Sequence, residues 1–397
     1  MTFITVSATL IAMTSLRQTG FGMSSAGVDR CGSKRDFLSI GHRTSVRQRL
    51  ALLMVSLSLT AAMIEAVMRL WPALFDFFPA PEYYMPHVFA EDPTITWTLK
   101  PNATSPHQHL KNDFAVRVNT DGRGMRRIPQ TPGRPNLLVL GDSFAFGFGV
   151  EDNETFPSRL AELMPGINVL NAGYTSGMSL DTQYLYLREH FDEFWPSLVI
   201  CQFCGGNDFG DIESNTWQTD TNGLPQKIVT AYLVDRRTGA LRITRTGALS
   251  NIAVFLRRHS FLCAFLLDRV AVVRGRFHGS AEAPPPEYRV ALARLRVLAA
   301  ALKQCSREKG FDLAFVFIPA TYDARVGRVV EPSEQTFKEY LRKLDIKYTD
   351  LETLRPYDRR TLHFPHDAHY TPFGNRLVAV ELNAFIRTNF PNVARAQ

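Results

Sequence analysis

Cysteine is scarce in this sequence, with 5 among 397 residues. An odd number this small excludes a framework of disulfide bonds as the source of stability. Cys201 and Cys204 have the spacing of a redox pair, but they lie on a predicted strand, where residues three apart point to opposite faces. We therefore predict two small buried side chains there, with neither a disulfide nor a metal between them.

Basic charge is also scarce where a nucleic acid would need it. The formal net charge is +7, but seven basic residues against two acids place +5 before residue 50 and leave about +2 for the rest of the chain. A nucleic-acid footprint should lie on the folded domain itself, so we expect no nucleic-acid partner. The N-terminal charges are those of Arg17, Arg30, Lys34, Arg35, Arg43, Arg47 and Arg49, against Asp29 and Asp36.

Two common cofactor signals are missing as well. Gly147 and Gly149 lie close together, but no Gly-Lys-Ser/Thr follows them, so a phosphate-binding loop is not predicted. His363 and His366 with Asp367 are candidate metal ligands, yet no carboxylate or thiolate cluster elsewhere in the sequence complements them. We expect no metal and no organic cofactor.

One long apolar run is present near the N-terminus. Leu50 to Ile64 carries only Ser and Thr as polar residues, and the run continues through Glu65 to Trp71. At 1.5 Å per residue this stretch is about long enough to cross a hydrocarbon core of ~30 Å. We predict a transmembrane helix over residues 47–71. The alternative is a buried amphipathic helix with Glu65 and Arg69 paired on its exposed face.

The charges that flank this predicted helix indicate an orientation. Basic residues precede it, whereas Trp71 and several acids follow it. The positive-inside rule then leaves the N-terminus in the cytoplasm and places the rest of the chain on the extracytoplasmic (periplasmic) side. The protein is thus expected to be a single-pass membrane protein.

The first 46 residues show no pattern of a folded domain. Phe3 to Met13 is apolar but lacks basic residues before it, so it makes a poor signal peptide. Gln18 to Ser45 is rich in Ser, Gly and Arg, as disordered tails are. Residues 1–46 are predicted to be a disordered or overlong N-terminal tail.

Two further segments follow the predicted membrane helix. Residues 72–130 are predicted to form a Pro/aromatic-rich arm with short strands, irregular from Phe75 to Lys100. Residues 131–397 form the main domain, with an insertion at about 211–280 that contains a hairpin signal from Tyr232 to Leu241. An apolar fraction of 45% with 21% charged residues allows a large core.

Short apolar runs alternate with helical patterns through the main domain. Asn136 to Gly141, Ile167 to Leu170, Leu198 to Phe203 and Leu313 to Ile318 are predicted buried strands. Their alternation with helices predicts an α/β fold with a parallel sheet. Helices are predicted over Phe156 to Leu163, Leu249 to Val273, Pro284 to Lys309, Ser333 to Leu344 and Pro372 to Asn389.

Candidate site residues follow three of these strands. Ser143, Gly173 and Asn207 each come after an apolar strand, and the carboxyl ends of parallel strands meet at one edge of a sheet. Acyl transfer at a serine needs an imidazole base and donors for the oxyanion. The segment from His363 to Gly374, just before the last helix, supplies histidines and Asp367.

Four sequence blocks, in order, carry a family resemblance. They are Gly141-Asp142-Ser143, Asn171-Ala172-Gly173, Gly205-Gly206-Asn207-Asp208, and Asp367-Ala368-His369 with Gly374. Together they resemble the blocks of SGNH (GDSL-type) hydrolases, over roughly residues 135–390. The resemblance implies a flavodoxin-like three-layer α/β/α domain with a central parallel sheet.

The resemblance also implies roles for individual residues. Ser143 would be the nucleophile, His369 the general base, and Asp367 the acid that orients His369. The oxyanion hole would consist of Ser143, Gly173 and Asn207. One departure is visible, because the family's acid stands three residues before the histidine, where this chain has His366.

Two acids near these blocks have structural interpretations. Asp142 is expected to cap the helix that follows it, since Asp is a preferred N-cap residue. Asp208 is expected to be structural as well.

These observations lead to one function and several alternatives. The sequence predicts a membrane-anchored serine esterase that hydrolyses an acyl ester, in particular an acetyl ester, of a carbohydrate or lipid. A polysaccharide O-acetyltransferase and a lipid esterase would use the same residues. An inactive carbohydrate-binding protein of the same fold is the alternative from another class.

Overall fold

A computed structural model describes most of the chain. The described residues are 45–71, 85, 87–109, 113–175, 177–236, 239–243, 256, 260–278, 288–319 and 324–394. Most of the predicted N-terminal tail and residues 72–84 of the predicted arm lie outside them.

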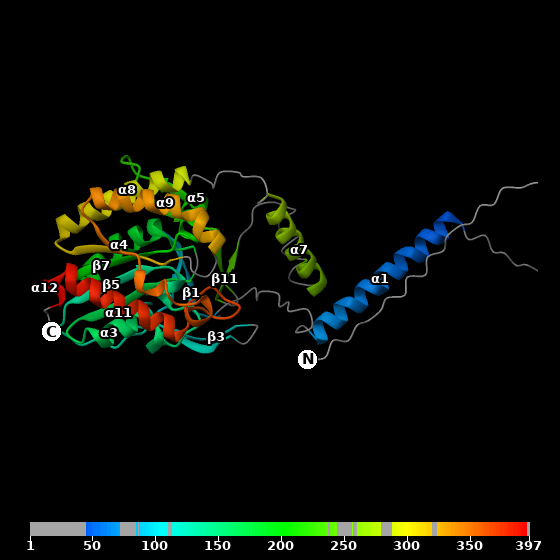
Figure 1. Cartoon of the computed structure of the whole chain (residues 1–397), viewed down its shortest axis with the longest axis horizontal. Helices are drawn as coiled ribbons and strands as arrows, with labels where there is room; N and C mark the ends of the chain where they lie inside the picture. The colour runs from blue at the N-terminus through cyan, green and yellow to red at the C-terminus, as the bar shows by residue number, and fades with distance from the viewer. Residues whose placement is uncertain are drawn as a thin grey trace, which may run out of the picture. The chain divides into compact units, whose positions relative to one another are not determined.

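A five-stranded parallel sheet forms the centre of the main domain (Figure 1). Its strands are β5 (Asn136–Gly141), β6 (Asn168–Gly173), β7 (Pro196–Phe203), β12 (Asp312–Phe317) and β13 (Lys347–Thr349). They lie in the order β13-β12-β7-β5-β6, and every adjacent pair is parallel. Counted along the chain this is the order 2-1-3-4-5 of flavodoxin-like folds. The predicted fold class is confirmed.

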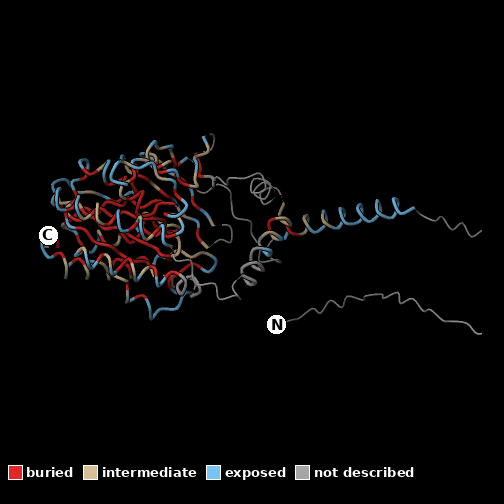
Figure 2. The backbone as a smooth tube through the Cα atoms, turned by 90° about the horizontal axis from the view of Figure 1, so that it is seen from above, coloured by how far each residue is buried: buried red, intermediate tan, exposed pale blue. Residues whose placement is uncertain are grey.

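Alternate residues of the strands supply two separate apolar cores. In β7, Val199 and Cys201 pack on one side of the sheet, whereas Leu198 and Ile200 pack on the other. Cys201 and Cys204 are both buried free thiols, as predicted. Figure 2 shows the buried residues gathered in the interior of the main domain.

Helices cover both faces and complete three layers (Figure 1). The first face packs against α4 (Leu180–Phe194), α8 (Arg289–Lys309) and α9 (Ala324–Lys343). The second face packs against α3 (Phe156–Leu163) and α11 (Pro372–Asn389). Shorter helices are α2 (Ser143–Phe146), α5 (Asp208–Ser214), α10 (Arg359–Leu362) and α12 (Pro391–Ala394), with the 3-10 turns η2 (Asp152–Glu154) and η3 (Glu352–Leu354).

The arm is more regular than its sequence predicts. It forms the hairpins β1 (Phe89–Asp92) with β2 (Thr96–Leu99), and β3 (Thr104–Gln108) with β4 (Ala115–Asn119). The prediction of an irregular segment is therefore wrong for residues 89–99. The strands of β1 and β2 have only four residues each, which is too short for a clear alternation.

The insertion also consists of two hairpins. They are β8 (Thr216–Thr219) with β9 (Pro225–Val229), and β10 (Tyr232–Asp235) with β11 (Ala240–Ile243). The predicted hairpin around residues 232–241 is confirmed. Thr96 Oγ1 donates to Ile228 O at 2.9 Å, so the insertion is bonded to the arm.

Helix α1 (Val46–Leu70) confirms the predicted N-terminal helix. It is the one helix among the described residues that is long and apolar enough to cross a membrane. The side chains of Leu53 and Leu57 are more than half exposed, and Figure 2 shows most of the helix as exposed. Length and composition are thus those of the predicted membrane span.

By its internal contacts the chain divides into two compact units, Met1–Leu57 and Ser58–Gln397. Glu65, the one acidic residue of α1, lies in the second unit and has hydrogen-bond partners there. Glu65 Oε1 accepts from Arg69 Nε at 2.7 Å, which is the i,i+4 pair named with the alternative of a buried amphipathic helix. The same carboxylate accepts from Phe261 N at 3.0 Å and Leu262 N at 2.9 Å. It thereby satisfies the first N–H groups of α7 (Phe261–His278). Most of the predicted helical segment before α7 lies outside the described residues.

Candidate active site

Ser143 is placed by the end of β5 and the start of α2. Asp142 adopts an extended conformation between them, and its Oδ1 accepts from Phe144 N at 2.8 Å. The predicted N-cap role of Asp142 is confirmed. Gly147 ends the short helix with a φ of +79°, a conformation that glycine adopts without strain. Ser143 thus stands at the carboxyl edge of the sheet.

His369 and Asp367 meet Ser143 at this edge. His369 Nε2 lies 2.6 Å from Ser143 Oγ, and His369 Nδ1 lies 2.5 Å from Asp367 Oδ1. The serine and the histidine are 226 residues apart in the sequence. The structure therefore brings together three side chains that the sequence analysis had grouped.

A local turn explains how an acid two residues before the histidine reaches its ring. Asp367 Oδ1 accepts the His369 backbone N–H at 2.8 Å and also contacts the ring Nδ1. Aspartate side chains commonly bond the backbone two residues ahead. The unusual spacing is thus compatible with a Ser-His-Asp arrangement.

The electrostatics of the site keep Asp367 ionised. Burial alone would raise the pKa of this carboxyl, but the hydrogen bonds and charge of His369 outweigh burial and lower the pKa to about 2. An ionised carboxylate at Nδ1 requires a proton on that nitrogen, which leaves Nε2 as the acceptor in the neutral ring.

Aromatic rings hold the imidazole of His369 in place. Phe148 stacks on it with ring centres 4.4 Å apart, and Phe144 lies 5.1 Å away at a tilt. His107 packs against Phe148 at 4.2 Å. Burial lowers the pKa of His107 to about 3, so its ring is neutral at physiological pH.

The donors near Ser143 differ in part from the predicted oxyanion hole. Asn207 Nδ2 donates to Asp142 Oδ2 at 2.9 Å and carries a second hydrogen. Within the described part of the chain, the Ser143 N–H has no hydrogen-bond acceptor. The Gly173 N–H, in contrast, donates to Asn171 Oδ1 at 3.0 Å. The assignment of Gly173 to the oxyanion hole stays a prediction, and in this structure its N–H is bonded within its own turn.

Asp208 and the other two histidines have partners of their own. Asp208 Oδ2 accepts from Cys204 N at 2.7 Å, which confirms its structural role. Burial lowers the pKa of His363 to about 4, and its Nδ1–H donates to Ala368 O at 2.6 Å. His366 bonds to Asp113. Among the described residues, no group of three His, Cys, Asp or Glu side chains is arranged to hold a metal.

Arg126 is a site-forming residue that the sequence analysis missed. Its buried guanidinium donates to Phe146 O, Gly147 O and Val150 O and pairs with Asp152 at 2.6 Å. It therefore fixes the loop that follows Ser143. Arg126 is one of several arginines in the arm, and the sequence does not distinguish it from Arg123 or Arg127.

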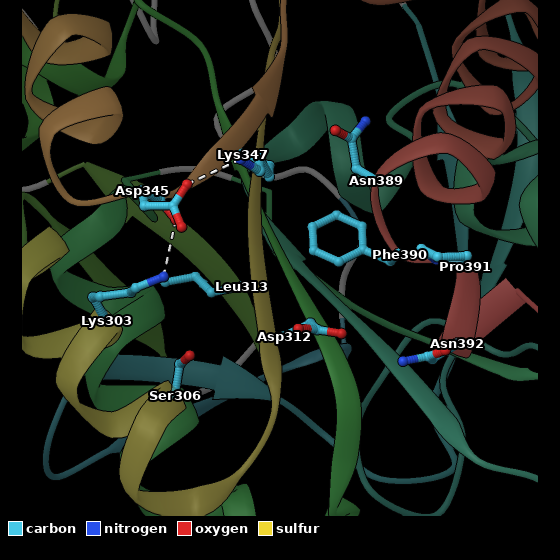
Figure 3. A pocket seen from close by; sticks show the side chains of 10 residues that line it. All are labelled: Lys303, Ser306, Asp312, Leu313, Asp345, Lys347, Asn389, Phe390, Pro391 and Asn392. Carbon is cyan, nitrogen blue, oxygen red and sulfur yellow. Dashed lines mark hydrogen bonds and ion pairs between the residues drawn. The ribbon is translucent and has the colours of Figure 1, made fainter.

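A polar cavity of about 270 Å³ lies at the opposite edge of the sheet (Figure 3). Asp312 and Lys347, which begin β12 and β13, line it. Figure 3 shows Lys303 and Lys347 both reaching Asp345, and Lys347 Nζ lies 2.9 Å from Asp345 Oδ1. Its lysines are thus paired, and the cavity is separate from Ser143.

Comparison with known proteins gives similarity in structure alone. No family model and no curated protein matches the chain. A lipolytic protein of the G-D-S-L family from Desulfitobacterium hafniense is 13% identical, with 64% of this chain and 99% of that chain covered and a TM-score of 0.36. A psychrotrophic esterase from Pseudoalteromonas sp. is 12% identical, with 64% and 97% covered and a TM-score of 0.34.

A catalytic mutant of an acetylxylan esterase from Geobacillus stearothermophilus is also similar. It is 15% identical, with 64% of this chain and 94% of that chain covered and a TM-score of 0.34. At these identities the likeness concerns the fold alone. The fold and the site define an α/β protein with a serine, a histidine and an aspartate in hydrogen-bonding order.

Proposed function

We propose that the protein is a serine esterase that works through an acyl-enzyme intermediate. One observation carries the proposal: Ser143 Oγ, His369 Nε2, His369 Nδ1 and Asp367 Oδ1 form a continuous chain with contacts of 2.6 Å and 2.5 Å. A serine hydroxyl at its ordinary pKa is a weak nucleophile, and an adjacent oriented base activates it.

Each group has a defined part in the reaction. Ser143 Oγ attacks the acyl carbonyl carbon while His369 Nε2 takes the hydroxyl proton. The tetrahedral intermediate collapses, and His369 returns the proton to the leaving alcohol. Water then attacks the acyl-serine, with His369 again taking and returning a proton, so that the acid is released. Asp367 stabilises the charged imidazolium throughout.

Two donors are proposed for the oxyanion. They are the Ser143 N–H and the second hydrogen on Asn207 Nδ2, which Asp142 orients through the first. Loss of a single such donor in other enzymes costs about 10²–10³-fold in kcat. Gly173 is not part of this proposal.

The membrane anchor belongs to the proposal as well. We propose that α1 spans a membrane once and that the catalytic domain lies on the extracytoplasmic (periplasmic) side. The length and apolar composition of α1 support the span, and the basic residues before it support the orientation. Alkaline phosphatase fused after residue 100 should be active, and activity of a cytoplasmic reporter at the same place would contradict it.

The esterase proposal is tested on the full chain in detergent. Wild type should hydrolyse p-nitrophenyl acetate and take up a fluorophosphonate label at Ser143, located by mass spectrometry. Ser143→Ala should lose both, whereas Ser214→Ala, which removes an exposed hydroxyl on α5, should keep both. Turnover that persists in Ser143→Ala would refute the proposal.

The same assay separates the alternatives. Acyl transfer to added oligosaccharide that outpaces hydrolysis would identify an O-acetyltransferase with the same residues. Preference for long-chain esters in lipid vesicles would identify a lipid esterase. A folded protein with neither label nor turnover would support the inactive carbohydrate-binding alternative.

A further inference from the structure

The loop that carries Asp367 and His369 is bonded to the arm. Asp113, just before β4, accepts the His366 N–H on Oδ2 at 2.8 Å and the His366 Nδ1–H on Oδ1 at 2.8 Å. The Asp113 side chain is only 3% exposed, whereas that of His366 is 40% exposed. Both oxygens of a buried carboxylate therefore bind the residue that immediately precedes Asp367.

Neighbouring contacts bring the arm to the same loop. The Phe114 ring packs against Phe364 with ring centres 5.1 Å apart. His109 Nδ1 lies 3.5 Å from Asp113 Oδ2. Burial of a carboxylate has a desolvation cost, which the hydrogen bonds of Asp113 to His366 offset. These two bonds fix His366 relative to the arm.

The position of His366 affects the acid directly. His363 begins the loop between α10 and α11, and its ring donates to Ala368 O in the later part of the same loop. At its earlier part, Asp113 fixes the backbone N–H and the ring of His366. Because Asp367 follows His366, this contact sets the direction from which the Asp367 carboxylate reaches His369.

We propose that Asp113 is a positioning residue for the Asp367–His369 pair, so that the arm forms part of the active site. The inference rests on the proposed esterase function. Asp113 touches none of the reacting atoms, and it acts by holding His366. Small displacements of catalytic groups, on the order of 1 Å, can cost about 10²-fold in rate.

The test uses the full chain in detergent, with active sites counted by fluorophosphonate labelling. Asp113→Ala should lower kcat per labelled site by about 10–100-fold while KM and the final labelled fraction stay unchanged. Asp113→Asn should recover most of kcat, because an amide oxygen still accepts the His366 N–H and its nitrogen can donate to the other ring tautomer.

A matched control exists in the same arm. Glu91 on β1 accepts from Arg236 at 2.7 Å and 2.8 Å, but both side chains are exposed. Glu91→Gln should leave kcat and KM at the wild-type values. A fall in kcat for Glu91→Gln equal to that of Asp113→Ala would overturn the specific role of Asp113.

Other outcomes also decide the question. If Asp113→Ala lowers the labelled fraction but not kcat per labelled site, its role is only structural and the inference is wrong. If that variant does not fold, His366→Ala removes the ring contact alone and should lower kcat several-fold; an unchanged kcat would overturn the inference. Turnover that survives Ser143→Ala would instead refute the esterase proposal itself.

Discussion

A single carboxylate oxygen of Asp367 serves both the backbone and the ring of His369. Replacement by asparagine keeps the shape of the side chain but removes the charge and permits the wrong ring tautomer. We expect Asp367→Asn to lower kcat by about 10⁴-fold with little change in KM. The measurement is p-nitrophenyl acetate turnover per folded molecule.

Asp358 supplies the control for this prediction. It is an exposed acid before α10 whose side chain makes no cap hydrogen bond. Asp358→Asn should behave as wild type. A loss of less than 10-fold in Asp367→Asn would show that another group orients His369.

A second prediction for a single residue concerns Arg126. Arg126→Ala would leave three carbonyl groups and Asp152 without their buried cation. We expect a loss of about 3–5 kcal/mol in the free energy of unfolding, measured by urea titration of tryptophan fluorescence. Arg123, exposed and paired with Asp121 at 3.2 Å, is the control, and Arg123→Ala should cost at most about 1 kcal/mol. Equal losses would contradict the role given to Arg126.

The residues that could be predicted from sequence are those at strand ends or in recognisable blocks. Ser143, Asn207 and His369 were found because parallel strands end at one edge and the blocks follow a known order. Spacing does not reveal that the Gly173 N–H donates to the side chain of Asn171. Arg126 and Asp113 act through contacts with segments far along the chain, and a sequence pattern does not contain such contacts.

Helix α5 begins directly after Asn207, and its first turn contains Asp208 and Asp211. Burial, together with the charges of Asp142 and Asp181, raises the pKa of Asp211 to about 7. The folded state therefore holds a proton on Asp211 between about pH 4 and 7 that the unfolded state has released. The stability contributed by this group is present at low pH and is lost as pH rises through 7.

Asp211→Asn removes this dependence. The difference in unfolding free energy between the variant and wild type should shift by about 3 kcal/mol in favour of the variant from pH 5 to pH 8. Urea titrations at the two pH values measure the difference. Asp192, 71% exposed beside Lys309, is the control, and Asp192→Asn should show no such change. An Asp211→Asn effect that is the same at both pH values would contradict the raised pKa.

At the scale of elements, buried strands were more predictable than edge elements. The central strands appear as unbroken apolar runs because both of their faces are covered. Helix α9 was predicted to start at Ser333, yet it spans Ala324–Lys343 and contains Pro332. Sequence rules treat a proline as a boundary, and they do not show when the surrounding fold accommodates it.

The chain consists of the N-terminal helix α1, the arm and the main domain, and truncation tests what each of the first two contributes. A protein that starts at residue 72 should leave the membrane fraction and keep its kcat for p-nitrophenyl acetate, because α1 contains no site residue. A protein that starts at residue 131 lacks Asp113 and Arg126, and its kcat should fall by at least about 100-fold. Cell fractionation and turnover per milligram measure both effects. Full activity from residue 131 onward would show that the arm is dispensable.

The separation of Ser143 from His369 by 226 residues has a consequence for the newly made protein. At about 5–20 residues per second of synthesis, the serine is made roughly 10–45 s before the base. Helix α11 must then pack beside α3, where Asn375 Oδ1 accepts from Phe156 N, before the histidine is in place. Under the proposed mechanism, Ser143 of a nascent chain has no base, and it becomes a reactive nucleophile only once α11 has docked.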